Sequence, residues 1–404
     1  MTTNWQNVKL IDVCDLIAGY AFKSGDFGNY MDKVIKITNI EPPFVNMKDL
    51  QGVDLSMYNK DKLQKYIAKK GDYVFAMTGA TIGKLGKICE EEAYINQRVL
   101  MFKPKEQIDK NFLFYILSQK RFYQYVLNHV DSDSAQANIS ANSVGGYDFN
   151  LPPLEVQRKI AGVLGALDDK IELNNRINQN LESQAQAIFI EQIQKNTTIG
   201  KIGDYCSVKS GFAFKSSWWK DSGTKVIKIK NIEVSGLNLN DCSFVSDDKI
   251  ALAKDFTVKG GDLLIAMTGA TIGKFAMVPH VDEILLVNQR VGKFFLGDNP
   301  LEKLPFIYCT LKQQEVVSEI INRGQGSAQP NISGNDIMSI SCIYPNNSVI
   351  EKFNNICKPY FEKIITNQYE NTKLSAIRDA LLPKLMSGEI DVENVPVSAI
   401  IPNE

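Results

Sequence analysis

Two stretches of the chain carry an apolar or amide side chain at every seventh residue. The first runs without proline from residue 154 to about residue 194, and the second follows Pro345. Heptad spacing sustained over so many residues is typical of a long helix packed along one side against another helix. The positions expected to face the seam between the helices are Ile160, Leu167, Asn174, Leu181 and Ile188 in the first stretch and Phe353, Tyr360, Asn367, Leu374 and Leu381 in the second.

The pattern ahead of each stretch is different. Short runs of β-branched and aromatic residues, such as 34–40 (VIKITNI) and 72–79 (DYVFAMTG), are bounded by Gly, Asn and Asp, and they predict strands. Residues 110–127 carry apolar side chains at helical spacing instead. We therefore expect a mixed α/β or α+β globule before each long helix.

The chain repeats itself almost from end to end, in the same order and at nearly constant spacing. A repeat of roughly 190 residues is far too long for a solenoid and means two homologous domains. The repeated pairs are 19–24 (GYAFKS) and 211–216 (GFAFKS), 34–40 (VIKITNI) and 226–232 (VIKIKNI), 71–84 (GDYVFAMTGATIGK) and 261–274 (GDLLIAMTGATIGK), 96–99 (NQRV) and 288–291 (NQRV), and 134–140 (SAQANIS) and 327–333 (SAQPNIS).

The two heptad stretches belong to this repeat, since Asn174 and Asn367 hold equivalent places in them. Repeated units are usually related by a two-fold axis, which makes equivalent helices antiparallel, and a polar seam residue commonly fixes their register. The predicted fold is α+β (mixed α/β): two homologous globular domains separated by two long antiparallel coiled-coil helices, with a pseudo-two-fold internal repeat. The predicted boundaries are 1–150 and 196–345 for the globular domains, 151–195 and 346–390 for the helices, and 391–404 for a C-terminal tail.

Composition narrows the function classes. With 44% hydrophobic and 23% charged residues, no apolar run long enough for a membrane span and no signal-peptide core, the chain is expected to be cytoplasmic. Its seven cysteines are odd in number and never spaced as CxxC, which favours reduced buried thiols over disulfides or zinc. Only two histidines are present, which disfavours most acid–base and metal catalysis. A net charge of −1 means that a nucleic-acid binder would need locally clustered lysines or a basic partner.

Two strings invite a catalytic interpretation and do not support it. GATIGK has three residues between its glycines and is followed by Leu85 or Phe275, whereas a phosphate-binding P-loop needs four residues and a Ser or Thr after the lysine. Residues 41–44 (EPPF) resemble the Asn/Asp-Pro-Pro-Tyr/Phe signature of amino-methyltransferases, but the longer Glu fits poorly and the second repeat keeps nothing like it. No glycine-rich loop for S-adenosylmethionine follows a predicted strand. We expect neither reaction in this chain.

Other strings carry side chains suited to DNA, each with a structural alternative. Gln and Arg can contact adenine and guanine edges in bidentate fashion, although the Asn-Gln-Arg strings could equally be polar turns with an ion-paired arginine. The Met-Thr-Gly-Ala-Thr turns permit close backbone approach to a phosphate or base, or simply end a strand. The amide-rich strings before each long helix could cap it, and the lysines beside aromatic residues could lie along a core. The candidates are Lys23, Lys36, Thr78, Thr81, Lys84, Gln97, Arg98, Gln136 and Asn138 in the first repeat and Lys215, Lys228, Lys230, Thr268, Thr271, Lys274, Gln289, Arg290, Gln329 and Asn331 in the second.

A family resemblance rests on four of these regions. Residues 151–160 (LPPLEVQRKI) with 167–171 (LDDKI), and residues 381–390 (LLPKLMSGEI), are very similar to the hinge and helix regions of the specificity subunits of type I restriction–modification systems. The AMTGATIGK and Gln-x-Asn-Ile-Ser strings resemble the target-recognition domains of that family. The resemblance covers essentially the whole chain. One departure is the second hinge, 343–347 (IYPNN), which lacks the double proline and the following Glu-x-Gln.

The resemblance implies a DNA-recognition subunit without catalytic activity of its own. Each target-recognition domain would read one half of a split double-stranded DNA sequence, and the paired helices would fix the gap between the halves. Two methyltransferase (modification) subunits would dock around the helices, and motor–nuclease (restriction) subunits would complete the complex. Adenine methylation with base flipping, together with S-adenosylmethionine, ATP and Mg, would belong to those partners, so no cofactor or metal is expected in this chain.

Two rival classes remain. A self-contained DNA-modifying enzyme is disfavoured by the missing cofactor loop and the scarcity of histidine. A scaffold that joins two proteins without touching DNA would also use long helices and duplicated globules. Salt-sensitive DNA binding by the reconstituted complex distinguishes the scaffold from a DNA reader.

Overall fold

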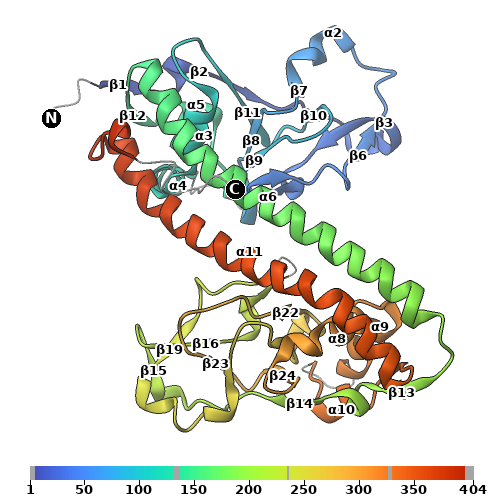
Figure 1. The fold of residues 1–404 in the computed structure, drawn as a ribbon. Helices are drawn as coiled ribbons and strands as arrows, with labels where there is room; N and C mark the ends of the chain where they lie inside the picture. Colours follow the sequence, from blue (N-terminus) through green and yellow to red (C-terminus); the bar gives the residue numbers. More distant parts are fainter. Residues whose placement is uncertain (1–4, 132–136, 234–235, 326–329, 396–404) are drawn as a thin grey trace. The chain divides into compact units, whose positions relative to one another are not determined.

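The computed structural model describes residues 5–131, 137–233, 236–325 and 330–395 (Figure 1). The chain divides into two compact units, one made of residues 1–168 with 376–404 and the other of residues 169–375. Each unit holds one strand-rich globule and part of each long helix, α6 (Leu154–Phe189) and α11 (Asn347–Ser387). The helix α6 continues into a five-residue π-helical segment, Ile190–Gln194. The predicted mixed class with two long helices is confirmed.

The globule of the first unit contains two main sheets. The larger has the strand order β2-β11-β8-β9-β5-β4 and the smaller β6-β3-β10-β7. The strands of the larger sheet are β2 (Cys14–Ala18), β11 (Val99–Pro104), β8 (Tyr73–Ala76), β9 (Leu85–Lys87), β5 (Phe44–Val45) and β4 (Ile40–Glu41), and those of the smaller are β6 (Gln51–Val53), β3 (Phe27–Ile35), β10 (Ala93–Ile95) and β7 (Ile67–Ala68). Two further strands, β1 (Gln6–Lys9) and β12 (Asp148–Leu151), pair antiparallel. The helices before α6 are α1 (Leu10–Val13), α2 (Lys60–Leu63), α3 (Lys110–Ser118), α4 (Lys120–Asn128) and α5 (Ala141–Gly145).

The apolar runs of β8 and β11 are explained by burial on both faces of the larger sheet. Phe75 and Phe102 point to one face, where they pack with residues of α3, α4 and α6. Val74 and Met101, on the other side of the same strands, belong to a second core beneath the smaller sheet. Because alternate residues of a strand point to opposite faces, a strand covered on both sides needs no polar positions.

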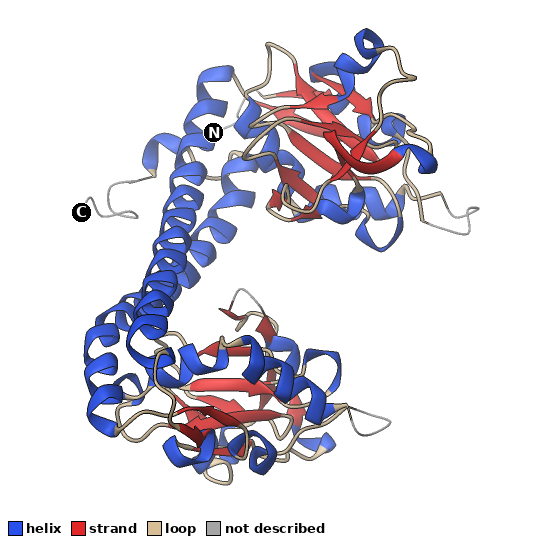
Figure 2. Ribbon diagram, turned by 90° about the vertical axis from the view of Figure 1, so that its right-hand side faces the viewer, coloured by secondary structure: helices blue, strands red, loops and turns tan. Residues whose placement is uncertain are grey.

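The second unit has the same arrangement, with helices packed against its sheets (Figure 2). Its order β14-β24-β21-β22 matches β2-β11-β8-β9 of the first unit, and a second sheet runs β15-β19-β16-β23-β20. The internal duplication predicted from the sequence is thereby confirmed. The strands are β13 (Ile199–Lys201), β14 (Ser207–Ser210), β15 (Trp219–Lys220), β16 (Thr224–Ile227), β17 (Ile232–Glu233), β18 (Gly236–Leu237), β19 (Ser243–Val245), β20 (Thr257–Val258), β21 (Leu263–Ala266), β22 (Phe275–Met277), β23 (Leu285–Val287), β24 (Val291–Phe295) and β25 (Ser341–Ile343), and the helices are α7 (Ile202–Tyr205), α8 (Leu304–Leu311), α9 (Gln314–Gly324) and α10 (Gly334–Met338).

A buried aspartate, Asp72, immediately precedes β8 in the first unit. The carboxylate of Asp72 accepts hydrogen bonds from the Lys103 ammonium at 2.5 Å, the Lys110 ammonium at 3.0 Å and the Lys69 backbone N–H at 2.9 Å. Burial alone would raise the pKa of Asp72, but these hydrogen bonds outweigh it and the pKa is lowered. The equivalent Asp262 of the second unit forms an ion pair with Lys293 at 3.0 Å. The glycine–aspartate start of this string is therefore structural in both units.

The segments of α6 and α11 that lie in the second unit pack antiparallel through asparagines. Asn174 donates to Asn371 at 2.9 Å, and Asn367 donates to Asn178 at 2.8 Å. Residue numbers fall along α11 as they rise along α6, as predicted. Asn174 and Asn367 hold equivalent places in the repeat but do not bond to each other. Each bonds to a residue one helical turn beyond the other, so a local two-fold axis passes between the two bonds. All ten predicted seam residues are at least half-buried: Ile160, Leu167, Asn174, Phe353, Asn367 and Leu374 are buried, and Leu181, Ile188, Tyr360 and Leu381 are half-buried.

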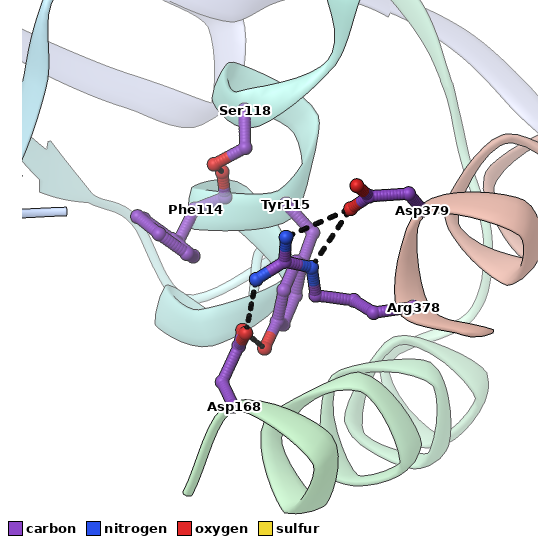
Figure 3. A network of polar contacts seen from close by, with 6 residues as sticks. All are labelled: Phe114, Tyr115, Ser118, Asp168, Arg378 and Asp379. Atoms are coloured by element: carbon purple, nitrogen blue, oxygen red, sulfur yellow. Dashed lines mark hydrogen bonds and ion pairs between the residues drawn. The ribbon is translucent and has the colours of Figure 1, made fainter. Parts of the chain in front are cut away.

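In the first unit a polar network joins the globule to both long helices (Figure 3). Asp168 of α6 accepts from the Tyr115 hydroxyl of α3 at 2.7 Å and from Arg378 of α11 at 2.7 Å. The Arg378 guanidinium also contacts Asp379, at 2.8 Å from Nη2. Because one carboxylate is shared by groups from two elements, it fixes α3 and α11 relative to α6 within this unit.

Candidate nucleic-acid interface

The five repeated strings, which lie far apart in the sequence, meet in one place in each unit. We call each meeting point a motif cluster. The first motif cluster consists of residues 19–23, 35–40, 77–84, 96–98 and 137–140, and the second of residues 211–215, 227–232, 267–274, 288–290 and 330–333.

Backbone hydrogen bonds hold three of the strings together. In the first unit the Met77 N–H donates to the Arg98 carbonyl at 3.0 Å, the Ile139 N–H donates to the Met77 carbonyl at 3.0 Å, and the Gly79 N–H donates to the Ala137 carbonyl at 2.9 Å. The equivalent bonds of the second unit have lengths of 3.0, 3.0 and 2.9 Å. The Gly-rich turn is therefore placed between the Asn-Gln-Arg turn and the amide-rich segment in both units.

A glycine brings the first string into contact with the Asn-Gln-Arg turn. A Cβ atom on Gly19 would lie 2.2 Å from the Asn96 carbonyl oxygen, and one on Gly211 would lie 2.5 Å from the Asn288 carbonyl oxygen. No side chain fits at such distances. The second string arrives from the other side, since the Asn96 N–H donates to the Ile35 carbonyl at 2.9 Å.

The Gly-rich turn connects two antiparallel strands. It leaves β8, makes a short 3-10 turn at Gly79–Thr81 and returns as β9, with Gly79 at φ 69° and Gly83 at φ 87°. A phosphate-binding P-loop would instead lead from a strand into the N-terminus of a helix. The geometry thus agrees with the spacing argument against nucleotide binding.

The candidate side chains differ in exposure. Arg98 of the first motif cluster contacts Asn138 Oδ1 at 3.3 Å through a terminal nitrogen while its side chain stays exposed. Thr78, by contrast, is buried. Lys23, Lys84, Gln97, Arg98, Lys215, Lys230, Lys274, Gln289, Arg290 and Asn331 are exposed, whereas Lys36, Thr81, Asn138, Lys228, Thr268 and Thr271 are half-buried. Gln136 and Gln329 lie outside the described residues.

Two equivalent lysines rest on aromatic rings. The Lys36 ammonium lies 3.8 Å from the centre of the Phe27 ring, and the Lys228 ammonium lies 3.6 Å from that of Trp219. Burial lowers the pKa of Lys228, and the nearby positive charge of Lys230 adds to the effect. Cation–π contacts hold both lysines in the turn that lies beside the Asn-Gln-Arg strings. Lys230, which the first repeat replaces with Thr38, forms an ion pair instead, with Asp241 at 2.8 Å.

Six of the seven cysteines are buried, and burial raises the pKa of the Cys206 thiol to about 12. Across the described ranges no three His, Cys, Asp or Glu side chains gather as ligands for a metal ion. None of the helices within those ranges is both long and apolar enough to cross a membrane.

The duplicated globules, each followed by a long helix, define the class of protein. The chain belongs to the family of type I restriction–modification DNA specificity domains, whose profile matches residues 2–183 and again residues 194–375. Both matches include a motif cluster and the start of a long helix.

Particular relatives support the same assignment. The chain is 27% identical over 334 residues to the type I restriction enzyme MjaIX specificity subunit of Methanocaldococcus jannaschii, covering 74% of this chain and 73% of that protein. It is 23% identical to the HindI specificity subunit of Haemophilus influenzae, covering 85% and 90%. The crystal structure of a type I system S subunit from M. genitalium shares the fold, with a TM-score of 0.57 at 17% identity over 95% of this chain and 96% of that one.

Sequence reasoning missed side chains that differ between the repeats. Tyr123 packs directly on Gly83 of the Gly-rich turn, but its string has no counterpart in the second half. Gln157, which is buried at the start of α6, accepts from the Asp109 N–H at 2.8 Å and donates to the Pro152 carbonyl at 2.8 Å. Gln157 could have been recognised in the sequence as a polar residue on an otherwise apolar helix face. No comparable signal marked Tyr123.

Proposed function

We propose that this chain is the sequence-reading subunit of a type I restriction–modification complex, with each globular domain reading one half of a split DNA target. The observation that carries the proposal is the duplicated motif cluster. It presents an exposed Gln-Arg pair beside an exposed lysine in both domains: Gln97 and Arg98 with Lys84, and Gln289 and Arg290 with Lys274.

The side chains of each cluster suit different parts of DNA. Planar amide and guanidinium groups can make paired hydrogen bonds to adenine and guanine edges in the major groove. The lysine of the Gly-rich turn is suited to a phosphate, which positions a protein on the duplex without specifying its sequence. The conformation of the clusters is held by backbone bonds, so their exposed side chains remain available for DNA.

The catalytic groups are assigned to partner subunits. In this proposal two methyltransferase subunits dock on the helix pair and supply S-adenosylmethionine and the adenine chemistry, and motor–nuclease subunits supply ATP and Mg. The overall charge of −1 is compatible with such sharing, because basic partners can contribute phosphate contacts. The complex would act in the cytoplasm, and this chain would set its target.

The proposal is tested by DNA binding of the complex with its methyltransferase subunits over a range of salt concentrations. Each phosphate contact contributes about −0.9 to the slope of log affinity against log salt. Replacing both Lys84 and Lys274 with Ala should make the slope shallower by roughly 2 without changing the preferred sequence. A complex that binds no DNA would leave the scaffold interpretation standing, and an unchanged slope in the double variant would count against the two lysine contacts.

A further inference from the structure

The two motif clusters share their exposed lysine, glutamine and arginine side chains, which limits what these three can distinguish. The lysine, glutamine and arginine of the first cluster recur unchanged in the second. Identical residues on equivalent backbones favour the same bases. A difference between the two half-sites must therefore come from other side chains, either within the clusters, as with Thr38 and Lys230, or beside them.

In the first unit such side chains lie on α4. A Cβ atom on Gly83 would lie 2.5 Å from Tyr123 Cε2, so the ring rests directly on the second glycine of the turn. Phe122 and Val126, on the adjacent face of α4, are buried in the core. Tyr123 is nevertheless 43% exposed, and Leu127, one helical turn further on, is 41% exposed. The buried face fixes the helix while this apolar pair faces solvent beside the turn.

In the second unit the equivalent place is taken by α9 and has a different surface. A Cβ atom on Gly273 would lie 3.5 Å from both Ile320 and Ile321. Ile320 is buried, and Ile321 is 36% exposed. The same turn is thus flanked by a tyrosine ring in one domain and by a branched aliphatic side chain in the other.

We propose that the exposed face of α4, formed by Tyr123 and Leu127, contacts the C5 methyl group of a thymine in the half-site read by the first domain, and so helps to distinguish that half-site from the other. This inference rests on the proposed function. Apolar side chains read thymine in the major groove through its methyl group, the one apolar feature that a base edge presents there. The adjoining Lys84 of the turn is exposed and can bind the neighbouring phosphate.

The test uses the complex with its methyltransferase subunits and a target mapped by methylation sequencing. Thymines of the first half-site are replaced one at a time by deoxyuridine, which lacks only the C5 methyl group. One replacement should weaken binding by the wild-type complex about fourfold, the equivalent of one buried methyl or methylene group. Tyr123→Ser should abolish that loss, because the contact is already missing, and Tyr123→Phe should preserve it.

Ile321→Ser is the matched control, since it alters the equivalent place in the other domain and should leave the deoxyuridine effect in the first half-site intact. Leu127→Ser provides a second reading of the same face if Tyr123→Ser fails to fold. The inference is overturned if no deoxyuridine in the first half-site weakens wild-type binding, or if folded Tyr123→Ser and Leu127→Ser complexes keep the full effect. Failure of the proposed function is recognised separately, because the wild-type complex would then yield no split target at all.

Discussion

Lengthening both long helices by one heptad tests whether they measure the gap between half-sites. The insertions belong between Arg176 and Ile177 of α6 and between Gln368 and Tyr369 of α11. The bonds from Asn174 to Asn371 and from Asn367 to Asn178 lie on either side of these points. Inserted residues then face each other, and both native pairings are kept.

The size of the effect follows from helix geometry. Seven residues at 1.5 Å each add about 10 Å, which corresponds to roughly three base pairs of DNA at 3.4 Å each. The unread gap of the target should lengthen by about three base pairs, and by fewer if the helices are inclined to the DNA. Binding should also weaken, since each domain would meet the groove rotated by nearly a third of a turn.

The assay is methylation sequencing of DNA from cells that express the altered chain with its methyltransferase subunits. A five-residue insertion at the same two points is the control, because five residues turn each helix about 140° out of phase, which moves the apolar stripe away from the seam and should destabilise the protein without defining a new gap. An unchanged gap after the heptad insertion, in a protein of normal stability, would refute the reasoning. The gap would then be set elsewhere, for instance by the way the partner subunits hold DNA.

Three further predictions concern single features. Replacing Gln97 and Arg98 together with Ala should weaken the discrimination between bases in one half-site only, by about 1–3 kcal/mol per lost bidentate contact. Equal changes at both half-sites in the sequenced methylation pattern would contradict this prediction. Asp72→Asn should lower the free energy of unfolding at pH 7 by about 2 kcal/mol, at the lower end for charged hydrogen bonds because its two lysines are partly exposed. Since the pKa of Asp72 is lowered on folding, this loss of stability should be full above the unfolded pKa of about 4 and should decline as the pH falls through the folded pKa, as denaturant titrations at a series of pH values from 7 downward would show. Replacing Asn174 and Asn367 together with Leu should raise the thermal midpoint, because the buried Asn367 Oδ1 has no hydrogen-bond partner among the described atoms, but should broaden the range of accepted gaps; a lower midpoint with an unchanged gap would argue against a register role.

Much of the architecture could be predicted because the repeat and the heptads are long-range patterns. Seven-residue spacing predicts a packed helix whatever its partner, and the equivalent places of Asn174 and Asn367 predict an antiparallel pair. The bonding of these asparagines was not predictable, since it depends on where the local two-fold axis crosses the pair. The repeated strings likewise identified the candidate residues without showing that all five strings meet.

Features without a counterpart in the repeat could not be predicted. Asp168 and Arg378 form the polar junction of the first unit, but the equivalent residues of the second unit are Phe361 and Ala185, both buried and apolar. A buried polar network and an apolar contact can occupy equivalent positions, provided that every polar group of the network has a partner. Tyr123 escaped notice for the same reason, because its importance lies in its contact with Gly83 rather than in any motif.

The central claim, that two homologous domains read two halves of one DNA target, is tested most directly by mapping methylated adenines. The chain is co-expressed with the methyltransferase subunit of its system in a host without other adenine methylation, and the modified positions are read by sequencing. We predict a single split target with an unread gap of fixed length. Its halves should be related in sequence and lie in opposite orientation, because a pseudo-two-fold axis between the repeats would present their shared strings as the arms of a dimer present theirs. Methylation at a continuous site, half-sites in the same orientation, or no methylation dependent on this chain would contradict the account.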